Sequence, residues 1–299
     1  MFEETNKSCE GPLWRSDLAC ERHRADTSVP GVEFKKEICD GYAWERIKIT
    51  SEAGARSIGR PCGIYDTLTL PRMDTMDEDE IDDAANEVAK ELCRIMDKME
   101  IYPDRLLVVG LGNDELTPDS IGPRVANNIN ATMHIKNFDP EMFEAMECSE
   151  IAVLAPGVMA QSGMESADLI IGICDRIEPD AVLAIDSLAS GSPTRLGTTI
   201  QISNTGIFPG SGIGNRQSPL NERVLGIPVI AIGVPTVIDS RIFLHGEGVK
   251  GNYGQKNTDA MFVSPQQIDG IAKAASQIIG TGINQAFGIV LLFKNKLIK

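Results

Sequence analysis

The sequence predicts an α/β protein whose layered, largely parallel sheet has helices on both faces. Between residues 105 and 234, apolar segments of strand length alternate with segments of helix length. Strands separated by helices are typical of a parallel sheet with right-handed crossovers. The chain has 299 residues, 42% of them hydrophobic, which is enough for a substantial core.

The N-terminal part is expected to begin with an extended polar arm over residues 1–30. Residues 45–50 alternate polar and apolar side chains and are predicted to form a strand. A glycine–proline turn at residues 59–63 precedes a second strand over residues 64–70. A helix is expected over residues 77–98, because its apolar side chains recur at helical spacing and its charges match the helix dipole.

The remaining elements are predicted from apolar runs and capping signals. Strands are expected at residues 105–109, 151–154, 181–185, 199–202 and 229–234, and helices at residues 120–130 and 167–177. A last helix is expected to begin at Ser264, a capping residue, with Pro265 in its first turn.

Two of these strands are each expected to end in a loop that carries an aspartate. Asp119 follows the strand that begins at residue 105, and Asp186 follows the strand that begins at residue 181. Loops after parallel strands converge at the carboxyl edge of a sheet, where ligands bind. Because two carboxylates close together can divide acid and base work between them, Asp119 and Asp186 are candidate catalytic residues for hydrolysis.

Glycine-rich loops are expected at the same edge. The loop at residues 110–113 lacks the third glycine of a dinucleotide fingerprint, because Glu115 stands in its place. A loop at residues 155–163 and a longer one at residues 205–216 complete the outline of a cleft. Backbone N–H groups of the longer loop could bind an oxyanion, which makes the following residues candidate supporting groups: Gly210, Ser211, Gly212 and Asn215.

Composition disfavours several other classes of protein. The net charge of −15 repels phosphate backbones, so direct binding of nucleic acid is not expected. Seven cysteines contain no C-x-x-C pair, so reduced thiols in a cytoplasmic protein are expected. The N-terminus is polar and no apolar run reaches about 18 residues, so neither a signal peptide nor a membrane span is expected. No cofactor is predicted.

The three histidines give weaker signals. His23 lies in the polar arm and His245 in an apparent surface loop, so neither is expected to act in a site. His134 follows the helix of the first aspartate and could orient a carboxylate, although a structural role is favoured. The sequence contains neither the G-x-S-x-G motif of a serine hydrolase nor the H-E-x-x-H motif of a zinc protease.

An ordered series of motifs resembles the spore germination protease family, peptidase family A25. The resemblance runs from about residue 13 to about residue 287. The matching segments are residues 15–21, 108–113, 117–123, 155–163, 184–190, 199–207, 209–215 and 227–237.

The resemblance implies an endopeptidase that degrades small acid-soluble spore proteins at germination. It also implies synthesis as a zymogen, assembly into a homotetramer and a cytoplasmic location in the spore core. The family's fold resembles that of the hydrogenase-maturation endopeptidases. Its two essential aspartates fall on Asp119 and Asp186 of this sequence.

The resemblance also implies a processing site. Substrates of the family are cut after Glu in a motif like Glu-(Phe/Ile)-Ala-Ser-Glu, and this chain carries Asp17-Leu18-Ala19-Cys20-Glu21. We therefore expect self-cleavage between Asp17 and Leu18. Residues 1–17 would be a propeptide and residues 18–299 a single peptidase domain, with an atypical tail at 288–299 that is given no role.

Three positions depart from the family pattern. Met133 stands where a basic residue is usual, Gly191 replaces another basic residue, and Asn204 replaces an aspartate. Each change could weaken an ion pair or alter specificity.

Two alternatives stay open. A divalent metal held by Asp119, Asp186 and either His134 or Glu165 could assist hydrolysis, as in the related maturation endopeptidases. The chain could also be a non-catalytic binding protein on the same fold. Within the aspartate pair, the sequence does not show which residue is the acid and which is the base.

Overall fold

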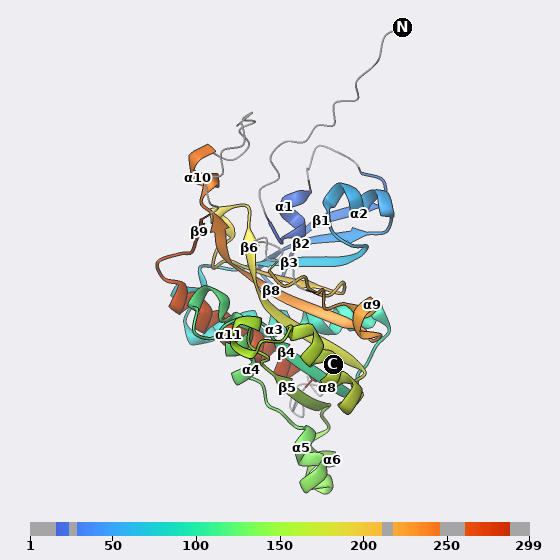
Figure 1. Cartoon of the computed structure of the whole chain (residues 1–299). Helices are drawn as coiled ribbons and strands as arrows, with labels where there is room; N and C mark the ends of the chain where they lie inside the picture. Colours follow the sequence, from blue (N-terminus) through green and yellow to red (C-terminus); the bar gives the residue numbers. More distant parts are fainter. Residues whose placement is uncertain (1–15, 24–28, 211–217, 246–260, 288–299) are drawn as a thin grey trace.

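The computed structural model describes residues 16–23, 29–210, 218–245 and 261–287 of the chain. Within these residues, nine strands form one sheet in the order β1-β2-β3-β7-β8-β6-β4-β5, and β9 pairs with β8. Helices lie on both faces of this sheet (Figure 1). The predicted α/β class is therefore confirmed.

One half of the sheet is parallel. It contains β4 (Arg105–Gly110), β5 (Glu150–Leu154), β6 (Ala181–Ser190) and β8 (Val229–Asp239). The helices α4 (Ile121–Asn127) and α8 (Ser166–Ile177) lie in the connections between them. The strands are apolar on both faces because helices cover both sides.

The other half is antiparallel, so the sheet is mixed. It contains β1 (Val32–Cys39), β2 (Tyr42–Ile49), β3 (Gly63–Thr69) and β7 (Thr199–Ser203). Strand β7 was predicted within a parallel sheet but runs antiparallel to β8. Only residues 191–198, with the single 3-10 turn η3 (Pro193–Arg195), join it to β6, and this connection is too short for a parallel crossover.

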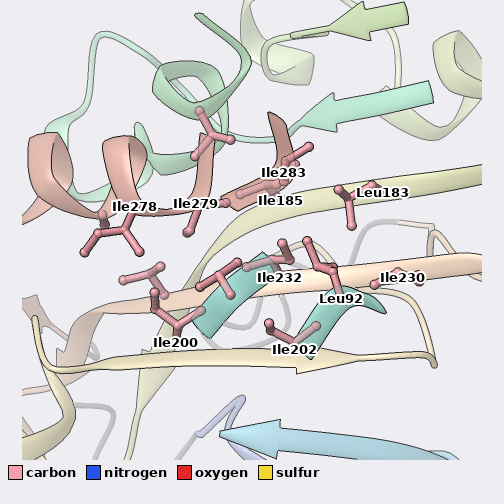
Figure 2. Packing of buried hydrophobic residues seen from close by; sticks show 14 of the residues in the cluster. Leu92, Leu183, Ile185, Ile200, Ile202, Ile230, Ile232, Ile278, Ile279 and Ile283 are labelled. Atoms are coloured by element: carbon pink, nitrogen blue, oxygen red, sulfur yellow. The ribbon is translucent and has the colours of Figure 1, made fainter. Parts of the chain in front are cut away.

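Three helices cover one face of the sheet: α3 (Glu78–Met99), α4 and α11 (Ile268–Phe287). Figure 2 shows isoleucine and leucine side chains of α3 and α11 pointing toward those of β6, β7 and β8. Helix α3 begins with a capping box in which Asp77 and Glu80 accept each other's backbone N–H groups.

The second face is covered by α1 (Ala19–Arg22), α2 (Glu52–Ile58) and α8. Leu18 and Ala19 are fully buried in this layer, so this part of the predicted extended arm packs onto the sheet. Residues 1–15, which make up most of the predicted propeptide, lie outside the described residues, as does the tail at 288–299.

The remaining elements are short, and most were not predicted. They are η1 (Met73–Thr75), η2 (Thr117–Asp119), α5 (Met133–Phe138), α6 (Pro140–Met146), α7 (Met159–Ser162), α9 (Glu222–Leu225), α10 (Arg241–His245) and β9 (Phe262–Val263). Among the described residues, no helix is both long and apolar enough to cross a membrane.

Candidate active site

Asp119 is held by the loop that follows β4. Its backbone oxygen accepts a hydrogen bond from the N–H of Asn113 at 2.9 Å. Thr236 of β8 donates its hydroxyl to the oxygen of Pro118 at 2.6 Å. A Cβ atom placed on Gly112 would lie 3.3 Å from the carboxyl carbon of Asp119. The carboxyl group therefore lies against Gly112, at the tip of β4.

The sequence suggested that Asp186 lies in a loop after a strand. The structure instead places it within strand β6. Strand β6 continues to Ser190 because its last residues still pair with β8, and Asp186 lies opposite Gly233 there. The residue is only 6% exposed, and its Oδ1 accepts a hydrogen bond from the N–H of Ser187 at 2.8 Å. Its carboxyl group is thus fixed by regular sheet structure.

The register of β4 and β6 brings the two aspartates to the same edge of the sheet. Gly110 lies opposite Ile185, and the N–H of Leu111 donates to the oxygen of Ile185 at 2.8 Å. The loop that carries Asp119 therefore starts directly beside Asp186. This placement agrees with the convergence that the sequence predicted for the two aspartates.

Burial raises the pKa values of both carboxyl groups, and the charge of Asp119 adds to the rise at Asp186. Burial raises the pKa of Asp119 to about 6, and the backbone N–H of Asn113 opposes part of this rise. Burial also raises the pKa of Asp186 well above its usual value, and the negative charge of Asp119 raises it further. Two carboxyl groups that interact in this way favour a state with one proton and one charge near neutral pH.

The N-terminal segment, residues 16–22, lies beside this pair. The N–H of Asp17 donates to the oxygen of Ala189 at 2.8 Å, and the N–H of Ala189 donates to Asp17 Oδ2 at 3.0 Å. Ala189 lies on β6, three residues beyond Asp186. The charge of Asp17 also contributes to the raised pKa of Asp186.

A small cavity adjoins the same segment. Its volume is about 30 Å³, enough for one or two water molecules. Side chains or backbone of Asp17, Arg60, Leu188, Gln201 and Gly233 are among the groups that line it. The sequence had given Arg60 only as part of a turn, and Gln201 only as part of an apolar strand. The polar Gln201 inside that strand was the available signal.

Comparisons with known proteins identify the family of the chain. The model of the germination protease family, Peptidase_A25, matches residues 15–245, most of the chain. The chain belongs to the germination protease family. It is therefore a peptidase of the family that the sequence resembles.

Curated germination proteases are similar over three quarters of the chain or more. That of Caldanaerobacter subterraneus is 38% identical, over 91% of this chain and 93% of the relative. That of Clostridium perfringens is 35% identical, over 91% of this chain and 94% of the relative. That of Bacillus cytotoxicus is 38% identical, over 76% of this chain and 63% of the relative.

Solved structures of hydrogenase maturation proteases are more distant. The NiFe hydrogenase maturation protease HycI from Thermococcus kodakarensis is 17% identical, with a TM-score of 0.35, over 61% of this chain and 94% of that protein. The hydrogenase maturating endopeptidase HybD from E. coli is 21% identical, with a TM-score of 0.26, over 44% of this chain and 74% of that protein.

The structure describes only two of the supporting groups that the sequence named, His134 and Gly210. His134 is exposed on α5, and nearby Thr132 bonds to the oxygen of Ile151 at 2.9 Å, near the start of β5. His134 therefore lies toward the amino end of the parallel strands and is not brought to the aspartate pair. Gly210 is described, whereas residues 211–217, with Ser211, Gly212 and Asn215, lie outside the described residues.

The residues named for a metal site are also not gathered together. Glu165 accepts a hydrogen bond from the hydroxyl of Ser218 at 2.6 Å. In the part of the chain that the structure describes, no three or more His, Cys, Asp or Glu side chains are grouped so that they could hold a metal ion.

The structure explains two of the three departures from the family pattern. Asn204 Oδ1 accepts a hydrogen bond from the N–H of Ile64 at 2.7 Å, and an aspartate could accept the same bond. Gly191 donates its N–H to Glu21 Oε2 at 2.6 Å. Nothing in the structure explains Met133, which is half-buried at the start of α5.

Proposed function

We propose that this chain is an endopeptidase that begins the degradation of small acid-soluble spore proteins during germination. Asp119 and Asp186 together activate the attacking water molecule. The observation that carries this proposal is the electrostatic effect of the half-buried Asp119 on the buried Asp186, beside the segment of residues 16–22. Membership of the germination protease family supports the peptidase activity.

The different burial of the two aspartates suggests a division of roles. Asp186 keeps its proton because it is the more deeply buried and lies beside other negative charges. Asp119 carries the charge and removes a proton from water, whose oxygen then bonds to the scissile carbonyl carbon. The proton of Asp186 passes to the carbonyl oxygen, which gives a neutral diol.

The second step breaks the carbon–nitrogen bond. The nitrogen takes the proton that Asp119 received, while a hydroxyl of the diol returns a proton to Asp186. The products are a carboxylic acid and an amine, and one water molecule is consumed. The backbone N–H groups of Gly210 and of the residues up to Asn215 stay candidates for stabilising the partial negative charge that develops on the carbonyl oxygen as water attacks.

We further propose that the chain is made as a zymogen that cuts itself between Asp17 and Leu18. Support comes from the hydrogen bonds that hold Asp17 against Ala189, which lies on β6 three residues beyond Asp186. From the family resemblance we also propose that the chain assembles into a homotetramer and is located in the spore core. Asp17→Ala should slow the self-cleavage strongly, as measured by the mass of the purified chain.

Incubation with a small acid-soluble spore protein tests the activity. The wild type should cut the protein after an acidic residue, whereas Asp119→Asn and Asp186→Asn should fold and leave it intact. Asp114→Asn is the matched control, because Asp114 is an exposed carboxylate in the same loop as Asp119.

Three results of this incubation would contradict the proposal. Full activity of either catalytic variant would show that the pair does not activate water. Loss of activity with a chelator, restored by a divalent metal, would favour the metal-assisted reaction. Binding without cleavage by the wild type would favour a binding protein.

A further inference from the structure

The segment formed by residues 16–22 is bound through contacts that a separate peptide could also make. Its helical turn, α1, lies against β2 and β3 (Figure 1). Leu18 and Ala19 are fully buried, whereas acidic residues stand on either side of them at Asp17 and Glu21. Ser16, within the segment, donates its hydroxyl to Glu21, and the other groups that hold the two carboxylates belong to the body of the protein.

The first carboxylate is held by a cation and a backbone donor. Arg60 donates from Nη2 to Asp17 Oδ1 at 3.0 Å, and the N–H of Ala189 donates to Oδ2. The side chains of Arg60 and Asp17 are only 12% and 11% exposed. A charged hydrogen bond shielded from water discriminates strongly against a neutral replacement.

The second carboxylate is held at the end of β6. Ser190 donates its hydroxyl to Glu21 Oε1 at 2.7 Å, and the N–H of Gly191 donates to Oε2 at 2.6 Å. A Cβ atom on Gly191 would lie 3.1 Å from Glu21 Oε2, so the glycine allows this close approach. Arg195 lies within electrostatic range, because the charge of Glu21 raises its pKa.

Gln201 holds the backbone between the two acids through hydrogen bonds that do not depend on the side chains of the segment. Gln201 accepts the N–H of Ala19 through Oε1 at 2.8 Å and donates from Nε2 to the carbonyl oxygen of Asp17 at 3.3 Å. The amide of Gln201 thus spans the Asp17–Leu18 bond. Gln201 and Asp186 both pair with Gly233, on either side of it. The amide that holds the Asp17–Leu18 bond and the candidate catalytic aspartate therefore lie in one row across the sheet.

From these contacts we infer that Arg60 and the Ser190–Gly191 turn are two carboxylate subsites for substrate. These subsites would hold the acidic residues at the two ends of the substrate motif that the family resemblance implies, one just before the cut bond and one four positions later. The inference rests on the proposed function and adds the residues that determine specificity. Because residues 16–22 fill both subsites, this segment must leave before another peptide can bind.

Four matched peptides test the inference. Each spans residues 12–26 of this chain, with Asp or Asn at the position of Asp17 and Glu or Gln at the position of Glu21. The wild type should cut the doubly acidic peptide with a kcat/KM at least about tenfold above that of either singly neutral peptide.

Variants then assign each preference to its subsite. Arg60→Met should reduce the preference for Asp over Asn to under about threefold, while the preference for Glu over Gln remains. Ser190→Ala should weaken only the preference for Glu over Gln. Arg56→Met is the matched control, since Arg56 is an exposed cation on α2. Thermal unfolding of each variant establishes that it is folded.

A second measurement does not depend on added peptide. The rates of self-cleavage in Asp17→Asn, Arg60→Met and the double variant form a double-mutant cycle, which should show coupling of at least about fivefold. Additive effects, or equal cleavage of all four peptides by an enzyme that cuts spore proteins, would overturn the subsites alone. Failure to cut any peptide or spore protein would overturn the proposed function as well.

Discussion

Asp186 and Gly233 are directly paired on the neighbouring parallel strands β6 and β8. A Cβ atom on Gly233 would overlap the side chain of Leu188, so Leu188 lies directly over the glycine. Leu188 also lines the cavity beside Asp17. The absence of a side chain at residue 233 therefore sets the position of one wall of the candidate site.

Replacing this glycine should damage both stability and processing. Gly233→Ala forces Leu188 to move, and such overpacking costs about 1–3 kcal/mol in the free energy of unfolding. Chemical denaturation measures this cost, and intact mass measures self-cleavage, which should slow. Gly172→Ala is the control, because nothing lies within 4 Å of that position on α8. Unchanged stability and processing in Gly233→Ala would contradict the assigned packing.

Gly112 should be equally intolerant, for a different reason. A Cβ atom there would overlap the backbone oxygen of Asp119, and the glycine has a φ of +113°. Gly112→Ala should therefore displace the Asp119 loop and abolish cleavage of substrate. Gly163→Ala shares the strain of a positive φ but has no neighbour within 4 Å, so it should keep most activity. Equal activity of the two variants would argue against a role for the loop position.

The pH dependence of the rate should follow the aspartate pair. Because burial raises the pKa of Asp119 to about 6, kcat/KM should rise as the pH increases through about 6. At higher pH the rate should fall when Asp186 loses its proton. Initial rates from about pH 4 to pH 9 measure this profile. A rate that is already maximal near pH 4 would contradict the assignment of Asp119 as the base.

The same carboxyl group should make stability depend on pH in a defined direction. A carboxyl group whose pKa is higher in the folded state than in the unfolded state binds more protons when folded. Its contribution to stability is therefore lost as the pH rises from about 4 through about 6. Asp119→Asn removes this loss, so its stability relative to wild type should increase over that range. Urea unfolding at several pH values measures the difference, and a constant difference would contradict the prediction.

Local signals in the sequence were sufficient to predict the strand before Asp119 and the long helix α3. The apolar run before Gly110 predicts β4, and the acids around Asp77 predict the start of α3. The structure places Asp186 inside β6 because pairing with β8 extends the strand beyond its apolar part. That pairing depends on residues more than 40 positions away, which no local pattern reveals.

The binding of residues 16–22 could not be predicted from composition for the same reason. This stretch is polar overall, yet Leu18 and Ala19 are fully buried because β2, β3 and Gln201 provide their partners. Only the similarity of residues 17–21 to the family's substrate motif suggested their importance. The contacts with Arg60 and Gly191 required the folded chain.

The most direct test of the central claim is the mass of the intact purified chain over time under conditions that allow processing. The wild type and Asp114→Asn should lose residues 1–17, whereas Asp119→Asn and Asp186→Asn should keep their full mass while remaining folded. Cleavage of both catalytic variants between Asp17 and Leu18 at the wild-type rate would show that the aspartate pair does not carry out the reaction.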